Sequence, residues 1–410
     1  MRKVLVGAVA AVVVAGGGVG AVVLSQDDAE PPLPLVSEPT PYPQRSALVG
    51  AAPDGAAPTR AGLQRAVGAS LHDRRLGRSV SLSVVDVSSG RVLLDVSGSR
   101  AVTPASTAKI ATAAAVLAVL PRDQRLTTRV VQGRPGELVL VGGGDPTLVG
   151  KAAAKGAKGP RLAELARQVQ AWQRTATAPV TRLLVDDALF TGPRLGPGWK
   201  QSYVQDGDVA PVSALEVDGG RVSPEDSSAR AADPALEAGR QLARLLRVRK
   251  VVRGTAPAGA AVVAHVSSEP VSALVERMLT RSDNDLAEAL GRHLALATHR
   301  PASFTGESAA ISAALREHGI EVALRDASGL SRQDRVRPAE LAALLAAAAR
   351  DGRYAPLLTG LPVAGFDGTL SERYRKTATR SAAGEVRAKT GTLDGVSALA
   401  GYVRTRNGRL

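Results

Sequence analysis

Cysteine is absent from the 410 residues, and aromatic side chains make up only 2% of them. Without a thiol the chain has no disulfide, no thiolate metal site and no cysteine nucleophile. The core must therefore be built from Ala, Val and Leu, and the apolar fraction of 44% is ordinary for a globular protein. The five histidines show no metal-ligand spacing, and no Gly-x-Ser-x-Gly motif occurs. These absences disfavour metal hydrolases and Ser-His-Asp hydrolases, and neither a metal nor a cofactor is expected.

The chain has a large excess of positive charge, with a formal net charge of +14. Such an excess is typical of nucleic-acid binders, but it also arises from a basic surface that is simply solvated. No basic segment interleaved with aromatic residues is present, and the N-terminus indicates export. We therefore expect no nucleic-acid partner, and at most weak contact with anionic wall polymers or with the membrane.

The N-terminus carries Arg2 and Lys3, followed by an apolar run over residues 4–24. This run is long enough to span the roughly 30 Å hydrocarbon core of a bilayer as a helix. The cationic end should stay inside, so the rest of the chain faces outward. Residues 1–25 are predicted to be a signal peptide or a membrane anchor, and no clear cleavage site decides between them. The proline-rich residues 26–58 predict an extended linker. The protein is thus expected to be extracytoplasmic, membrane-anchored or secreted to the cell wall.

The remaining residues show both strand and helix patterns. Alternating apolar residues over 80–87 and 91–96 predict a β-hairpin, and residues 387–403 predict further strands. An Ala-rich helix is expected over residues 105–119, and helices return from residue 267. Residues 147–264 differ in composition from the rest of the chain, with low-complexity and Gly/Pro-rich stretches. They are interpreted as a domain inserted into a catalytic domain of residues 59–146 and 265–410.

Ser106 and Lys109 form the first candidate catalytic motif. Residues three apart share one face of a helix. A serine hydroxyl needs a base to take its proton, and a lysine can serve only when its amine is neutral. Burial and a nearby cation both lower a lysine pKa and supply that condition. The chain has only nine lysines, and Lys109 alone has a serine three residues before it. Taken by itself, the pair is equally typical of an exposed helical lysine beside a capping serine.

Ser282 and Asn284 form the second motif, and Asn284 is one of only two asparagines in the chain. Ser282 could relay a proton between Lys109 and a leaving amine, while the Asn284 amide could bind a substrate carbonyl and hold Lys109. The alternative is a helix-capping turn, since Ser, Asp and Asn all cap well.

Lys389, Thr390 and Gly391 form the third motif, on a predicted strand. Lys389 and Thr390 could hold a carboxylate, and Gly391 permits the close approach of a substrate backbone. The backbone N–H groups of Thr392 and Ser106 could form an oxyanion hole. The alternative for Lys389 is a charge that protects an edge strand.

The three motifs occur once each and in this order, which resembles the low-molecular-weight class C penicillin-binding proteins, the S13 family of D-alanyl-D-alanine carboxypeptidases and endopeptidases. Other stretches are similar to that family, among them residues 141–148, 210–218, 326–332 and 365–370. The resemblance implies an α/β (α+β) fold, with a serine transpeptidase domain like that of β-lactamases, an antiparallel sheet flanked by helices, and an inserted domain. It implies an acyl-enzyme on Ser106, a peptidoglycan stem peptide ending in D-Ala-D-Ala as substrate, and binding of β-lactam antibiotics.

Several alternatives stay open on the sequence. A D,D-endopeptidase or transpeptidase would use the same site with a different leaving group or acceptor. A β-lactamase would need a further group to hydrolyse the acyl-enzyme, and a silent wall-binding protein would use no catalytic group. Asn407 and Gly408 read as a hairpin turn near the C-terminus, with too few residues after them for a returning strand. From this we expect a truncated C-terminus and an unpaired sheet edge beside residues 396–403.

Overall fold

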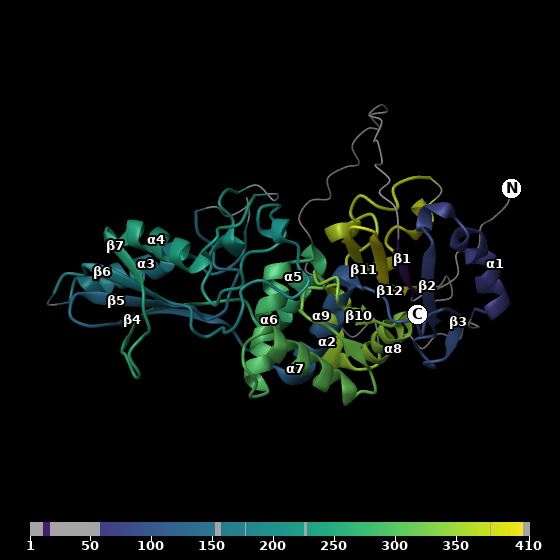
Figure 1. Ribbon diagram of the computed structural model, residues 1–410, viewed down its shortest axis with the longest axis horizontal. Coiled ribbons are helices and arrows are strands. Elements are labelled where there is room, and N and C mark those ends of the chain that lie inside the picture. Colours follow the sequence, from purple (N-terminus) through teal and green to yellow (C-terminus); the bar gives the residue numbers. More distant parts are fainter. Residues whose placement is uncertain are drawn as a thin grey trace, which may run out of the picture.

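The computed structural model describes residues 11–16, 58–151, 157–176, 178–224, 228–377 and 379–404. Two five-stranded sheets lie at opposite ends of an elongated molecule, and helices α5, α6 and α7 lie between them (Figure 1). The described helices are α1 (Arg60–Leu71), α2 (Ala108–Val119), α3 (Leu162–Gln173), α4 (Pro234–Leu246), α5 (Val271–Arg281), α6 (Asn284–Ala297), α7 (Phe304–Arg316), α8 (Pro338–Ala348) and α9 (Ala355–Thr359).

The first sheet is antiparallel and has the order β11-β12-β1-β2-β3. Its strands are β11 (Val386–Leu393), β12 (Val396–Val403), β1 (Ala11–Gly16), β2 (Ser79–Val85) and β3 (Val92–Val96). The predicted hairpin near residue 90 is β2 and β3, and the predicted C-terminal strands are β11 and β12. A short pair, β9 (Val322–Ala323) and β10 (Arg335–Val336), lies elsewhere.

Helix α2 is the centre of the main core. Ten of its twelve residues, Ala108 to Leu117, are buried, as is typical of a helix that is apolar on every side. Small Ala side chains let α5, α6, α7 and α8 approach it closely. This packing holds the beginning of α2, and hence Ser106 and Lys109, in a fixed position.

The second sheet has the order β7-β6-β5-β4-β8 and carries α3 and α4. Its strands are β4 (Thr127–Gln132), β5 (Glu137–Val141), β6 (Arg182–Asp186), β7 (Lys250–Arg253) and β8 (Val262–Ser267). Strands β4 and β5, and the end of β8, lie outside the predicted insertion of residues 147–264, although they pair with strands inside it. The domain limits therefore stay a prediction.

Strand β1 changes what the sequence led us to expect at the sheet edge. Ala11–Gly16 pairs with both β12 and β2. The expectation of an unpaired edge beside β12 is wrong, because an apolar segment from the N-terminal run fills that position. The predicted Asn407–Gly408 turn and almost all of the predicted linker lie outside the described residues.

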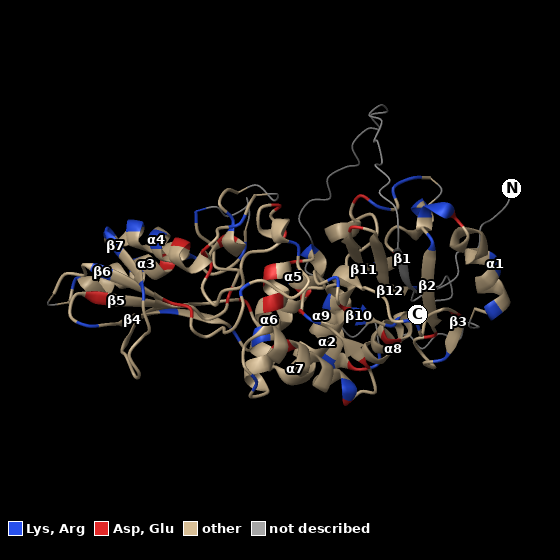
Figure 2. Cartoon of the chain, in the orientation of Figure 1, with Lys and Arg blue, Asp and Glu red and all other residues tan. Residues whose placement is uncertain are grey.

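Two further features bear on location and charge. None of the helices in the described ranges is long and apolar enough to cross a bilayer. Lys and Arg are spread from α4 and β7 at one end of the molecule to α1 at the other (Figure 2).

Candidate active site

Ser106 lies in a 3-10 turn, Ala105–Thr107, that leads directly into α2. Ala105 has a positive φ of 48°, a backbone conformation that non-glycine residues rarely adopt and that costs energy. Thr107 closes the turn, since its hydroxyl donates to the Pro104 carbonyl at 2.7 Å. The sequence placed Ser106 on a helix, and the structure places it one turn before the regular helix.

The Lys109 amine is fully buried and has three hydrogen-bond acceptors. Its Nζ lies 3.1 Å from Ser106 Oγ, 2.6 Å from Asn284 Oδ1 and 2.7 Å from the Ser328 carbonyl oxygen. These contacts use all three donors of an ammonium group. Lys109 thus faces Ser106 as the motif spacing predicted.

The second motif joins two helices. Ser282 ends α5 in the left-handed conformation, with φ 58°, and Asp283 caps α6 by accepting from the Leu286 N–H. This sharp connection places Asn284 on the first turn of α6, where its side chain reaches Lys109. The capping alternative and the catalytic interpretation are therefore compatible, because Asp283 caps the helix while Ser282 and Asn284 face the site.

The third motif lies on β11. Lys389 is fully buried, and its Nζ donates to Ser282 Oγ at 2.7 Å and to the Thr390 carbonyl at 2.9 Å. The Thr390 hydroxyl donates to Thr369 Oγ1 at 2.8 Å. Ser282 therefore contacts Lys389, whereas the sequence led us to expect a relay with Lys109.

Gly391 explains how β11 fits against the turn that carries Ser106. A Cβ atom added at this position would lie 2.7 Å from the Pro104 carbonyl oxygen and 3.1 Å from the Ser106 nitrogen. The sequence attributed this glycine to the approach of a substrate backbone, and the structure adds a close approach of the protein's own backbone. The predicted oxyanion donors on Ser106 and Thr392 come from these two adjoining segments.

Burial acts on the protonation of both lysines. It lowers the pKa of Lys109 to about 8, partly opposed by the negative charges of Asp326 and Glu288. Burial also moves the pKa of Lys389 well below its usual value, and the positive charge of Lys109 adds to this effect. Burial and mutual repulsion thus both disfavour the state in which the two amines are protonated together.

The structure adds groups that sequence reasoning did not assign. The carbonyls of Ser328 and Asp208 accept from Lys109 and from Asn284 Nδ2, respectively. Any residue could supply these backbone acceptors, so residue identity does not reveal them; Ser328 lies in the stretch 326–332 that stood out by resemblance, and Asp208 lies just before the stretch 210–218. Thr369 lies in another such stretch and supports Thr390.

A cavity of about 510 Å³ adjoins the second motif. Ser282, Asn284 and Thr369 line it on one side, together with Arg277 and Arg281. Since Ser282 and Thr369 hydrogen-bond Lys389 and Thr390, the cavity lies next to the pair that the sequence assigned to a substrate carboxylate. Among the described residues, no group of three or more His, Asp or Glu is arranged to hold a metal ion.

The fold is similar to that of penicillin binding protein 4 from Haemophilus influenzae. Its crystal structure aligns with a TM-score of 0.65 and 23% identity over 80% of this chain and 88% of that chain. A complex of the same protein with a β-lactam aligns with a TM-score of 0.58 and 24% identity over 79% of this chain and 86% of that chain. The mixed α/β fold of a penicillin-binding protein is therefore confirmed.

Sequence relatives agree with this fold. The chain is 39% identical over 389 residues to a carboxypeptidase of Mycobacterium tuberculosis, covering 91% of this chain and 83% of the relative. It is 41% identical over 370 residues to carboxypeptidase DacB of Mycolicibacterium smegmatis, covering 86% and 79%. The D-Ala-D-Ala carboxypeptidase 3 (S13) family matches residues 63–231 and 223–410. The chain belongs to this family and is a serine-type D-Ala-D-Ala carboxypeptidase.

Proposed function

We propose that Ser106 is the nucleophile of this carboxypeptidase and that Lys109 is its general base. One observation carries the proposal: the buried Lys109 amine lies 3.1 Å from Ser106 Oγ. Once Lys109 is neutral, its lone pair can accept the hydroxyl proton as Oγ attacks the carbonyl between the two D-Ala residues. The N–H groups of Ser106 and Thr392 stabilise the oxyanion that forms.

Collapse of the tetrahedral intermediate breaks the peptide bond. The leaving D-Ala nitrogen receives the proton that Lys109 took, and D-Ala departs as a free amino acid; passage of this proton through Ser282 requires the Ser282 hydroxyl to turn toward Lys109 from Lys389, which it contacts in the structure. Water then hydrolyses the ester on Ser106, with Lys109 again accepting a proton. Each proton taken is returned, so the cycle consumes one water and releases one D-Ala.

Lys389 and Thr390 are assigned to the terminal carboxylate of the substrate. A carboxylate beside Lys389 favours the protonated form of that amine. The positive charge on Lys389 disfavours a proton on Lys109, while the negative charge of the carboxylate offsets part of that effect. A β-lactam carries a carboxylate in the corresponding place, which supports its role as a ligand of the same site.

Release of D-Ala from a pentapeptide tests these roles. The wild type should release D-Ala, whereas Ser106→Ala and Lys109→Arg should be nearly inactive. Arginine keeps the positive charge but cannot be deprotonated in a protein. An active Lys109→Arg variant would contradict the base assignment, and an active Ser106→Ala variant would contradict the nucleophile.

The cavity beside Ser282 favours a second candidate activity, D,D-endopeptidase cleavage of cross-linked stem peptides. Its place next to the carboxylate-binding pair offers room for a leaving group larger than D-Ala. A purified cross-linked muropeptide dimer tests this directly, because an endopeptidase releases monomers from it. Recovery of intact dimer under conditions that release D-Ala from a pentapeptide would exclude the activity.

A peptidoglycan substrate places the enzyme outside the cytoplasm. We further propose that residues 1–25 direct export as a signal peptide or anchor, with residues 26–58 as a linker; in that role Ala11–Gly16 leaves the sheet, and the edges of β12 and β2 that β1 covers become unpaired. A reporter that is active only outside the cytoplasm, fused after residue 60, tests this. Activity of a reporter that works only in the cytoplasm would contradict it.

A further inference from the structure

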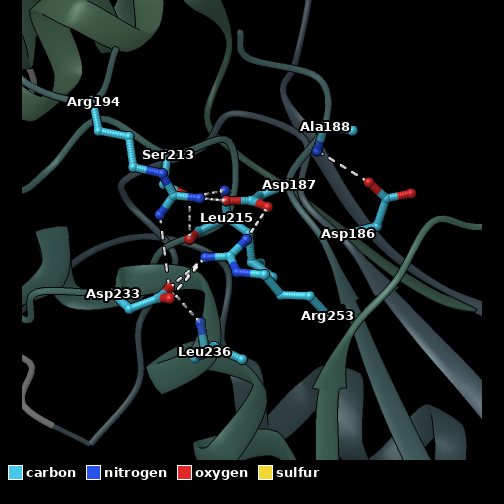
Figure 3. A network of polar contacts seen from close by, with 9 residues as sticks. All are labelled: Asp186, Asp187, Ala188, Arg194, Ser213, Leu215, Asp233, Leu236 and Arg253. Atoms are coloured by element: carbon cyan, nitrogen blue, oxygen red, sulfur yellow. Dashed lines mark hydrogen bonds and ion pairs between the residues drawn. The ribbon is translucent and has the colours of Figure 1, made fainter. Parts of the chain in front are cut away.

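One segment of the predicted insertion reaches into the catalytic centre. We call residues 194–213 the bridging loop. Both ends of this loop are fixed at one polar network (Figure 3), where Arg194 donates to Asp187 at 2.6 Å and Ser213 Oγ donates to the same carboxylate at 3.2 Å. The Val212 N–H also donates to the Arg194 carbonyl at 2.8 Å. Arg253 lies beside Arg194 and contacts both Asp187 and Asp233. The loop therefore leaves the second sheet and returns to it at one rigid point.

Pro197 and Trp199, in the first part of the bridging loop, contact the segment 326–331. Trp199 Nε1 donates to Asp326 Oδ2 at 2.7 Å, and the Pro197 carbonyl accepts from Ser331 Oγ at 2.6 Å. The Trp199 ring also packs edge-on against Phe304 of α7, with ring centroids 5.3 Å apart. The indole is thus held in one orientation by packing and by its N–H.

Segment 326–331 in turn presents an acceptor to Lys109. The Asp326 carboxylate accepts from the N–H groups of Gly329 and Ser331, both at 2.7 Å, and Asp326 is fully buried. This places the Ser328 carbonyl 2.7 Å from Lys109 Nζ. Gly329 lies so close to the Ser106 turn that an added Cβ would meet the Ala105 carbonyl oxygen at 2.0 Å. A shift of Asp326 would therefore be transmitted to both Lys109 and the turn.

The same loop also supports a second acceptor of Lys109, the Asn284 side chain. The Asp208 carbonyl accepts from Asn284 Nδ2 at 2.8 Å, which fixes the amide with Oδ1 toward Lys109. Two of the three acceptors around the lysine amine are thus oriented through the bridging loop. The third is Ser106 itself.

We propose that Trp199 is a positioning residue for the base Lys109, acting through Asp326, and that the inserted segment completes the catalytic centre in this way. The inference rests on the proposed role of Lys109. It predicts that weakening the Trp199 contact slows the proton transfer step, while binding of the ligand carboxylate at Lys389 and Thr390 stays as it is. A purely structural role for the indole would lower thermal stability without separating these two steps.

The chain has only two tryptophans, which provides a matched control. Trp199→Phe keeps a ring against Phe304 but removes the N–H donor to Asp326. Trp172→Phe makes the same change on α3, at the far end of the molecule. There the partly buried ring packs against the hydrophobic core between the second sheet and helices α3 and α4. Stopped-flow acylation by a fluorescent penicillin gives the acylation rate constant k2 and the dissociation constant Ks separately, and a melting curve reports folding.

We expect k2 to fall about tenfold in Trp199→Phe, since misplacement of a catalytic group by about 1 Å can cost up to 10²-fold. Ks should stay within twofold, and Trp172→Phe should match the wild type in both constants. Ser331→Ala weakens the same contact at Pro197 without touching the indole, and it should lower k2 severalfold. If Trp199→Phe does not fold, the k2 of Ser331→Ala alone tests whether the contact between the bridging loop and segment 326–331 positions Lys109.

Wild-type k2 in both Trp199→Phe and Ser331→Ala would overturn the inference and leave the proposed function intact. An equal fall of k2 in Trp172→Phe would overturn it as well, by showing a general loss of stability. A wild type that forms no adduct would overturn the proposed function, and this inference with it.

Discussion

Replacing Gly391 with alanine tests whether the contact between β11 and the Ser106 turn sets the geometry of the nucleophile. The new Cβ would lie 2.7 Å from the Pro104 carbonyl oxygen, whereas real Cβ atoms essentially never come closer than 3.0 Å. The two segments must separate by at least 0.3 Å, the difference between these distances. Both neighbouring atoms belong to the backbone, so no flexible side chain can absorb the change.

The size of the effect follows from this displacement. If a shift of about 1 Å costs about 10²-fold in rate, and the loss scales in free energy, then 0.3 Å costs about fourfold and about 0.5 Å costs about tenfold. We therefore expect k2 for a fluorescent penicillin to fall fourfold to tenfold. The oxyanion donors of Ser106 and Thr392 move apart in the same step, which adds to the loss.

Gly68→Ala provides the control, because an added Cβ there meets nothing within 4 Å. In the middle of α1 this change should leave k2 unaltered and stabilise the helix by up to about 1 kcal/mol. A Gly391→Ala enzyme that acylates at the wild-type rate would refute the reasoning. It would show that the turn tolerates displacement from β11.

Three further changes have defined outcomes. Acylation should accelerate as pH rises through about 8, because burial lowers the pKa of Lys109 to about 8 and only the neutral amine accepts a proton; a flat profile of k2/Ks between pH 6 and 9 would contradict this. Arg292→Met removes the cation that lies 3.1 Å from the fully buried Glu307. Because burial raises the pKa of Glu307 well above its usual value, the carboxyl can take up a proton instead of remaining charged, so the free energy of unfolding in urea should fall by about 1–3 kcal/mol, and an unchanged free energy of unfolding would disagree. Val13→Pro, in a protein that keeps residues 1–25, removes a backbone donor from the middle of β1, between β12 and β2, and should cost about 1–3 kcal/mol; an unchanged melting temperature would show that this segment does not pair in the sheet and would agree with its role as a signal peptide or anchor.

The proximity of the candidate catalytic side chains could be predicted because their chemistry restricts residue type. Ser106, Lys109, Ser282, Asn284 and Lys389 come from three separate segments, and the fold brings them within hydrogen-bond range of one another. Lysine and asparagine are scarce in this chain, so each motif had few competitors. Their roles in the reaction stay predictions until the variants are measured.

The supporting contacts could not be predicted, because they depend on the tertiary fold. The Ser328 and Asp208 carbonyls act through backbone atoms, which any residue could supply. Trp199 is far from Asp326 in sequence, and nothing in its local pattern distinguishes it from a core aromatic residue.

The order of the strands in the sheets could not be predicted either. The local pattern predicted β2, β3, β11 and β12, but pairing between distant segments decides which strand lies beside which. Strand β1 comes from an apolar run that fits a membrane segment equally well by hydropathy. Strands β4 and β8 pair across more than a hundred intervening residues. Local composition placed the start of the insertion at residue 147, between these two strands, so it separated β4 from the sheet to which it belongs.

The identity of the nucleophile is the central claim, and locating the β-lactam adduct tests it most directly. The enzyme is incubated with benzylpenicillin and digested, and the modified peptide is sequenced by tandem mass spectrometry. The account predicts one penicilloyl group per chain, on Ser106, and none in Ser106→Ala. An adduct on another residue, or one that persists in Ser106→Ala, would contradict it.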